Sequence, residues 1–393
     1  MNQNTSAKNE FSPSLAASLF VKDGHPQFSY LCGEDGTAAA KLINDSLLNL
    51  AKDGHGALAD LVSVTPKEIA PELKDILHSS SRNLFVIDLA AKKFPFNYDP
   101  FHGKNVDECG NVAVGLLGIH EGVNAGAEHF ASVASAYVRA VIDLHFEIYD
   151  SFAFSDLVDY FCTTERLHVE IDKIKSFGND VKDFTPHTKW AEAFYSNGQF
   201  NYKLFVQNLG GFVGNLNMLR SEYKGLFDAV DAEKPTLNLK DAFRNNDVIM
   251  IDTSSYEDDR KSVGQFLKRL VAADATVTIR HFLINHELEK VFALLLNKNS
   301  IVPQELIAHV VTIGRKAKLA LQRQYCSYED FKKEPFDFRN TLTHNTHYKI
   351  IFSEKPQTDE GGLTAEQLEM KNKLNHQEFM VIHQGETNVL EMK

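Results

Sequence analysis

A short glycine-containing turn near the start of the chain has the setting of a phosphate-binding loop. Its sequence is Gly33-Glu-Asp-Gly-Thr-Ala-Ala-Ala40, between a strand predicted over 28–32 and a helix predicted over 38–52. In such a loop, glycines let backbone N–H groups approach phosphates, a lysine reaches the β- and γ-phosphates, and a hydroxyl binds Mg²⁺. The order strand, turn and helix therefore indicates a phosphate-binding position.

The side chains of this turn lack the groups that phosphate chemistry needs. In the pattern GxxxxGK[ST], three consecutive alanines take the places of the second glycine, the lysine and the hydroxyl residue. Two acids inside the turn also place negative charge where a phosphate would bind, at the helix N-terminus. On spacing alone, an acidic turn that caps a helix is the favoured interpretation. The degenerate positions are Gly33, Gly36, Thr37, Ala38, Ala39 and Ala40.

Alternating strands and helices surround the turn. Apolar runs and turn residues predict further strands, helices and a C-terminal hairpin. Because strands and helices alternate, we expect an α/β fold with a parallel sheet. The predicted strands cover 84–89, 247–251, 291–296, 318–321 and 348–352. Helices are predicted over 262–273 and 303–312, and a third begins at a capping box at 364–367 and continues to 374. The predicted hairpin pairs 379–382 with 388–390.

A long helical stretch interrupts this alternation. Helical periodicity and few prolines extend from about residue 127 to 230, with helices predicted over 130–149, 152–162 and 205–219. We therefore expect one α/β domain in two parts, split by an all-α insertion. The predicted ranges are 1–12 for a disordered tail, 13–120 and 241–393 for the two parts of the α/β domain, and 121–240 for the insertion.

The charge and composition of the chain exclude several classes of protein. The 393 residues include 41 basic and 53 acidic ones, a net charge of −12, and the insertion holds 11 basic and 17 acidic residues. Strong free-standing nucleic-acid binding is therefore disfavoured. The polar start and the absence of a long apolar run predict neither a secretory signal nor a membrane span. We expect a cytoplasmic protein.

Candidate metal and thiol chemistry is weak. His281 and His286, and His344 and His347, form spaced pairs, but neither pair has a carboxylate or cysteine at ligand spacing. We expect no metal and no cofactor. The cysteines form no CxxC motif, which disfavours a disulfide framework or a zinc ribbon. They are Cys32, Cys109, Cys162 and Cys326.

From about residue 26 to 390, the chain resembles the cytoplasmic part of type IV secretion coupling proteins, the TraG/TraD-type conjugative-transfer ATPases. The resemblance implies a RecA-like P-loop NTPase sheet, sandwiched by helices and interrupted by an all-α domain. Each motif is short, and their joint order carries the resemblance. In order, they are the turn at 33–40, 83–88 with 96–101, 237–252, 291–298, 301–316, 325–331 and 374–385.

The resemblance also implies the positions of the remaining catalytic groups. The family's acidic Walker B pair, which holds Mg²⁺ and polarises the attacking water, corresponds to Asn297 and Lys298. Its sensing glutamine corresponds to Cys326. Arg315 matches the family's arginine segment near the subunit interface, or is a solvated cation at a helix end. These departures predict a degenerate member without ATPase activity.

The main hypothesis is a pseudo-ATPase that serves as a protein-interaction or scaffold component of a conjugation or type IV secretion apparatus. It would act at the cytoplasmic face of the bacterial inner membrane, recruited by a coupling ATPase or an adaptor. One alternative is a weak or partner-completed ATPase subunit of a DNA or protein translocation motor. Another is a regulator that reuses the fold outside secretion. Because the insertion is acidic and rich in Phe and Tyr, we also expect surface aromatics there that dock a basic partner; the alternative is that they fill its core.

Overall fold

The computed structural model describes residues 9–10, 18–33, 37–60, 66–89, 91, 93–117, 125–163, 166, 169, 195–196, 199–223, 225–227, 234–252, 261–352, 363–375 and 378–391. The chain forms two compact units. The sheet unit comprises Met1–Asp88, Asp241–Ser255 and Ile279–Lys393, and the helical unit comprises Leu89–Lys240 and Tyr256–Thr278.

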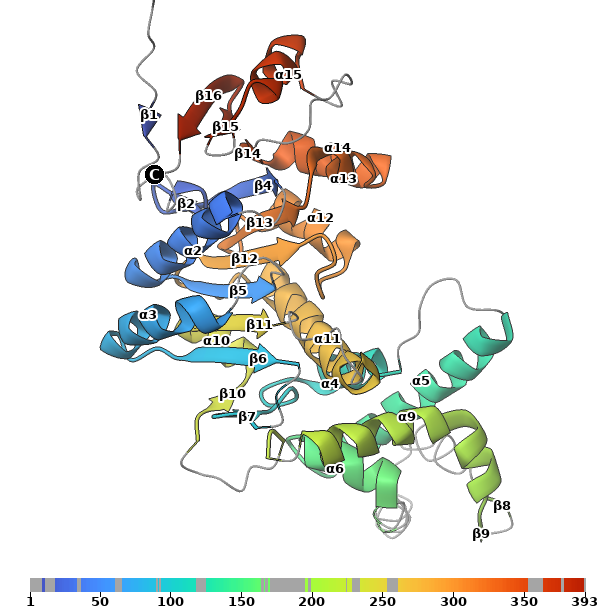
Figure 1. Ribbon diagram of the computed structural model, residues 1–393. Coiled ribbons are helices and arrows are strands. Elements are labelled where there is room, and N and C mark those ends of the chain that lie inside the picture. Colours follow the sequence, from blue (N-terminus) through green and yellow to red (C-terminus); the bar gives the residue numbers. More distant parts are fainter. Residues whose placement is uncertain are drawn as a thin grey trace, which may run out of the picture. The chain divides into compact units, whose positions relative to one another are not determined.

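The sheet unit is built on a ten-stranded sheet in the order β1-β16-β15-β14-β4-β13-β12-β5-β11-β6 (Figure 1). All neighbours from β14 to β6 are parallel, whereas β14, β15 and β16 form an antiparallel meander. The predicted α/β class with a parallel sheet is therefore confirmed. The strands are β1 (Asn9–Glu10), β4 (Phe28–Cys32), β5 (Gly56–Asp60), β6 (Leu84–Asp88), β11 (Val248–Asp252), β12 (Phe292–Asn297), β13 (Leu319–Tyr325), β14 (Tyr348–Phe352), β15 (Glu378–His383) and β16 (Glu386–Glu391). A separate short hairpin, β2 (Val21–Lys22) with β3 (His25–Pro26), precedes β4.

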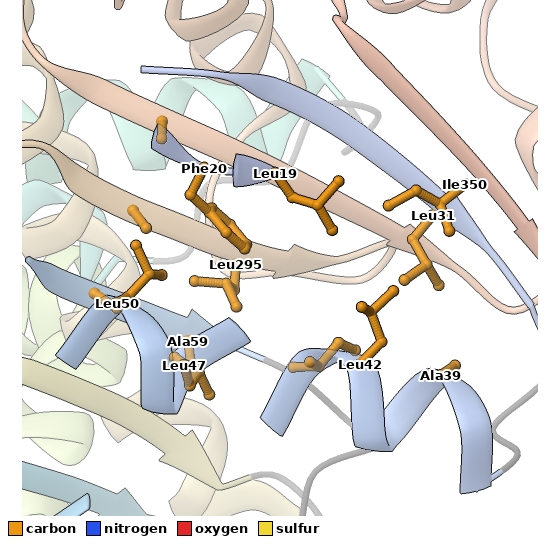
Figure 2. Close-up of a cluster of buried hydrophobic side chains, with 14 of the residues drawn as sticks. Leu19, Phe20, Leu31, Ala39, Leu42, Leu47, Leu50, Ala59, Leu295 and Ile350 are labelled. Carbon is orange, nitrogen blue, oxygen red and sulfur yellow. The ribbon is translucent and has the colours of Figure 1, made fainter. Parts of the chain in front are cut away.

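Helices α2 (Thr37–Lys52) and α3 (Pro66–Ser79) share a core with one face of this sheet. Leu42, Leu47 and Leu50 recur at helical spacing on α2 and are fully or almost fully buried. They meet alternate residues of the strands, such as Leu295 (Figure 2). The apolar stripe that predicted α2 from the sequence thus positions the helix directly after the glycine-containing turn.

Aromatic stacking holds helices on the opposite face. The ring of Phe292 on β12 stacks on Phe243 of α10 (Leu239–Asn245) at 3.7 Å between centroids. Phe243 also stacks on Phe282 of α11 (Lys261–Asn285) at 5.5 Å. The remaining helices of this unit are α12 (Gln304–Ile313), α13 (Tyr328–Lys332), α14 (Phe336–Asn345) and α15 (Ala365–Asn372). The predicted capping box of α15 is present between Thr364 and Gln367.

The helical unit has an aromatic core. The ring of Phe161 packs edge-on against Tyr137 at 5.9 Å and against Phe212 at 5.1 Å between centroids, and all three side chains are buried. Its elements are α4 (Val106–Gly115), α5 (Ala125–Phe146), α6 (Phe154–Val158), a π-helical turn (Asp159–Thr163), α9 (Tyr202–Glu222), the strand pair β7 (Asn97–Tyr98) with β10 (Thr236–Leu237), the strand pair β8 (Tyr195–Ser196) with β9 (Gln199–Phe200), and the first part of α11.

The expected surface aromatics are not found in the described part of the helical unit. The large apolar side chains exposed there are Val169, Leu204 and Val206, none of them aromatic. Edge-to-face aromatic packing favours burial of these rings. The aromatic residues described therefore mainly build the unit's own core, as the alternative predicted, and the other aromatic side chains of the insertion lie outside the described residues.

The unit boundaries also differ from the predicted ranges. Residues 89–117, assigned from sequence to the α/β part, group with the helical unit. One reason is that β7 pairs with β10, and another is that α4, which Asn105 caps, packs on α5. The tail predicted over 1–12 contains strand β1, in which Asn9 pairs with Leu390 and Glu10 with Glu391 of β16. An unpaired sheet edge gains backbone hydrogen bonds from such a segment, so the prediction of disorder is wrong for these two residues.

A buried ion pair ties segments of the helical unit together. The ammonium of Lys104 lies 2.7 Å from Asp274 Oδ1 on α11, and both side chains are fully buried. Tyr98 donates a hydrogen bond to Asp274 Oδ2 at 2.7 Å, and Thr278 donates to Oδ1 at 3.3 Å. Burial raises the pKa of Asp274, and the Lys104 charge opposes that shift. The carboxylate is therefore stabilised only while its partners remain.

We expect Lys104→Met to lower the free energy of unfolding by about 3–5 kcal/mol, because it leaves an unpaired buried carboxylate. The double variant Lys104→Met, Asp274→Leu should lose less than this single variant. Urea unfolding followed by far-UV circular dichroism measures both. Lys203→Met, an exposed position on α9, is the matched control. A double variant that loses more than Lys104→Met alone would contradict this reading of the pair.

Candidate functional site

The candidate site is the edge where the parallel strands end, here called the carboxyl edge. Asn297 ends β12 and pairs in register with Gln324, two residues before Cys326. Gly33 directly follows β4, and one strand, β13, separates β4 from β12. Neighbouring strands lie about 4.8 Å apart, so the ends of β4 and β12 are about 10 Å apart. The edge therefore brings Gly33, Asn297 and Cys326 to neighbouring strand ends, with Lys298 following Asn297.

Three further strands end in aspartates at the same edge. Asp88 ends β6 and pairs with Asp252 of β11, and Asp60 of β5 pairs with Leu296 of β12. The sequence analysis did not identify these acids as site residues. Nothing local distinguishes them, because only the strand order places them side by side. Even so, the described residues contain no group of three His, Cys, Asp or Glu that could hold a metal ion.

Gly33 has a packing role. A Cβ at this position would lie 2.8 Å from Cδ2 and 2.9 Å from Cβ of Phe352, closer than real side chains approach. The Gly33 N–H donates to the Tyr325 carbonyl at 3.1 Å, so the backbone is also fixed between neighbouring strands. The residue after β4 must therefore be glycine whether or not a phosphate binds nearby.

The rest of the turn contributes little that phosphate could use. Gly36 lies outside the described residues, and for Thr37 and Ala38 only the backbone, which starts α2, is described. Ala39, at the position of the lysine, is buried in the core beneath the sheet (Figure 2), and Ala40 is half-buried. A lysine side chain at position 39 would be attached to a buried backbone position and not to the surface of the turn.

The side chain of Asn297 is engaged at both ends. Its Nδ2 donates to the Asp60 carbonyl at 2.9 Å, and its Oδ1 accepts from the Asn299 N–H at 2.6 Å. Only 8% of the residue is exposed. Mg²⁺ prefers negatively charged carboxylate oxygens. The amide of Asn297 carries no charge, and both its oxygen and its nitrogen are already hydrogen-bonded to the protein, so it does not replace a carboxylate ligand.

Buried charges hold the loop that follows β12. Asp60 Oδ2 accepts from the Ile301 N–H at 2.6 Å. From β13, Arg323 Nη2 donates to the Lys298 carbonyl at 2.6 Å, and Nη1 donates to Ser300 Oγ at 2.9 Å. Asp60 and Arg323 are almost completely buried. The acid and the guanidinium at this position thus bind the protein's own backbone.

Lys298 pairs with an acid on α13, the helix that follows β13. Its Nζ lies 3.0 Å from Asp330 Oδ1, and this hydrogen bond is the main reason that the pKa of Asp330 lies below its ordinary value. Ser327 caps the same helix, α13, by accepting from the Asp330 N–H. Cys326, just before the cap, is exposed. A thiol is only a weak hydrogen-bond donor and acceptor, so it cannot replace a glutamine amide.

Arg315 lies at the opposite edge of the sheet. Its guanidinium contacts His347 and lies over the ring of Phe28 at 5.8 Å from the centroid. Phe28 begins β4, whereas Gly33 follows its end, and five residues of strand span about 16 Å. The structure therefore does not bring Arg315 together with the other candidate residues within one chain, and its predicted place near a subunit interface stays a prediction.

No protein-family model and no curated protein sequence matches the chain. Among solved structures, the bacterial conjugative coupling protein TrwB in complex with sulphate matches with a TM-score of 0.55 at 13% identity, covering 98% of this chain and 92% of that one. TrwB in complex with ADP and Mg²⁺ matches with a TM-score of 0.57 at 13% identity, covering 98% and 88%.

A third structure, VirB4 of Thermoanaerobacter pseudethanolicus, matches with a TM-score of 0.48 at 10% identity, covering 95% of this chain and 92% of that one. The likeness to TrwB over nearly the whole chain confirms the predicted RecA-like fold. At this identity it shows the fold alone.

If Gly33 is needed for packing, Gly33→Ala should lower the free energy of unfolding by about 1–3 kcal/mol, as overpacking does. Combining it with Phe352→Leu should cost less than the sum of the two single changes, because the smaller side chain makes room. Chemical denaturation measures the four-member cycle. Gly211→Ala on α9, where a Cβ meets open space, is the control and should be stabilising. Additive costs would disprove the contact.

The environment of His347 predicts acid sensitivity. Its Nδ1 accepts from the Phe28 N–H at 2.9 Å, and burial together with the Arg315 charge lowers its pKa to about 4. The unfolded chain, with an ordinary histidine pKa of about 6.5, binds the proton more readily. This contribution to stability is therefore present above pH 6.5 and is lost as the pH falls toward 4.

In His347→Asn, whose side-chain oxygen can still accept from Phe28, the loss of thermal stability between pH 6.5 and 4 should be smaller than in the wild type. His344→Asn, an exposed position, should leave the pH profile as it is. Unfolding temperatures across this range measure both. Parallel profiles for the wild type and His347→Asn would show that His347 does not titrate in this way.

Proposed function

We propose that the chain is a non-hydrolysing relative of the type IV secretion coupling ATPases, acting as a protein-interaction or scaffold component of a conjugation or type IV secretion apparatus. One observation carries the proposal. At the end of β12, the side chain of Asn297 is bound at both ends to the protein, and Lys298 is paired with Asp330.

Phosphoryl transfer depends on groups aimed at the phosphates, a metal ion and the attacking water. Each such group is typically worth several kcal/mol of transition-state stabilisation. The described side chains do not fit a nucleotide with Mg²⁺: position 39 is a buried alanine, and position 297 is an amide already bound to backbone. The nearest buried acid, Asp60, accepts from the backbone of Ile301.

The scaffold role is supported by the carboxyl edge, where polar side chains bind the protein's own loop. Asp60 and Arg323 hold the loop after β12 through bonds within the chain, and these bonds stabilise the edge independently of any nucleotide. The likeness in fold to TrwB, a bacterial conjugative coupling protein, supports a proposed place in a secretion or conjugation apparatus.

The proposed partners are a coupling ATPase or an adaptor protein. None of the helices in the described ranges is long and apolar enough to cross a membrane. We therefore place the chain at the cytoplasmic face of the inner membrane through such a partner rather than through a span in the described residues.

Purified protein should show no Mg²⁺-dependent ATP turnover and no rise in unfolding temperature with millimolar ATP and Mg²⁺, since bound ligand would stabilise the fold. Asn297→Asp with Lys298→Glu should not create turnover, because the lysine and hydroxyl of the turn are still missing. An active coupling ATPase assayed in parallel is the positive control. Turnover by the wild type that Asn297→Ala abolishes would contradict the proposal, and turnover only with a partner present would favour a partner-completed motor.

A further inference from the structure

The helical unit contains an open cavity of about 110 Å³. Its lining residues come from α6, the π-helical turn, the C-terminal end of α9 and the residues just after that helix. No step of the proposed function uses it. The lining residues are Phe154, Ser155, Val158, Asp159, Arg220, Tyr223 and Phe227.

The wall of the cavity is aromatic. The rings of Phe154 and Phe227 stack at 4.0 Å between centroids with 21° between their planes. The hydroxyl of Tyr223 donates to the Leu89 carbonyl at 2.8 Å, so the polar end of that side chain is already bound. A cavity of 150 Å³ with apolar walls accepts benzene, so this one has room for a single small apolar group, such as a phenyl ring partly enclosed at the mouth.

The charges at the cavity differ in whether they are already paired. Asp159 Oδ2 accepts from Arg166 Nη1 at 3.3 Å, and the same guanidinium binds Asp156 at 2.6 Å. Arg220, in the last turn of α9, is exposed and makes no ion pair within the described ranges. The available charge at the cavity is therefore positive, although the chain as a whole carries −12.

We propose that this cavity binds a small apolar carboxylate, with the apolar group against Phe154 and Phe227 and the carboxylate on Arg220. A guanidinium and a carboxylate form a two-pronged, charge-assisted hydrogen bond, which fixes the orientation of the ligand. The aromatic wall accommodates the apolar part by stacking or edge contact. The ligand class is thus an aryl or branched-chain carboxylic acid with one apolar group.

This inference goes beyond the proposed function and does not depend on it. The site lies wholly within the helical unit and involves neither nucleotide nor the carboxyl edge. Its test uses no ATP, so either conclusion can fail while the other stands.

The test compares phenylacetate with its uncharged isostere phenylacetamide, titrated against the full chain by ligand-observed NMR. Phenylacetate should bind saturably, and phenylacetamide about tenfold more weakly, because it lacks the charge-assisted bond to Arg220. Arg220→Gln should remove this difference, and Arg220→Lys should retain part of it. Lys203→Gln, on the same helix but outside the cavity, should bind like the wild type.

Two further variants test the cavity itself. Val158→Phe fills it, and Ser155→Phe, at an exposed position on its lining, narrows the mouth without altering a buried residue. Either change should abolish saturable binding of both compounds in protein whose circular dichroism is unchanged. Equal binding of the acid and the amide, no saturation by phenylacetate in the wild type, or undiminished binding in folded Ser155→Phe would each overturn the proposal.

Discussion

The parallel alignment of seven strands, from β14 to β6 in sheet order, is the constraint on which the rest of the structure depends. Parallel strands require crossovers and place all their carboxyl ends at one edge. Residues as distant in sequence as Gly33 and Cys326 therefore meet there. The alignment is kept even where the helical unit is inserted, since β6 and β11 still pair in register from Leu84 with Val248 to Asp88 with Asp252. The insertion adds a second unit inside one crossover and leaves the edge in place.

Polar groups at that edge can serve either the fold or a reaction, but one lone pair cannot serve both. The carboxylate of Asp60 accepts from a backbone N–H, and the guanidinium of Arg323 donates to a carbonyl and a hydroxyl of the same loop. Burying such charges costs several kcal/mol unless they are hydrogen-bonded. Their bonds to the loop after β12 offset part of that cost and fix the loop.

The sequence predicted the elements with strong apolar patterns and missed those without. Strands β4, β6, β11 and β12 are apolar runs and were predicted within a residue or so. Strand β5 (GALAD) was missed because its small residues carry little hydrophobic signal, although Gly56 and its neighbours must be small beside Phe292. β13 was predicted to end at 321 but continues to Tyr325, with Gln322, Arg323 and Gln324 buried. Their burial depends on partners from other segments, which no local pattern reveals. For the same reason, the sequence did not identify Asp60 as a residue of the carboxyl edge.

Gly33 shows why a retained motif residue is weak evidence for a retained activity. The glycine would be read as a remnant of a phosphate-binding loop, yet the side chain of Phe352 leaves no room for a Cβ at that position. The packing of β14 beside β4 requires this glycine whether or not the turn carries a lysine and a hydroxyl. In a fold of this kind, glycines needed by the sheet and charges needed by the phosphates are under different physical constraints. A glycine kept for packing therefore says nothing about whether the charges that phosphate needs are present, whereas Arg220, which makes no ion pair with the described residues, places a cation at a cavity.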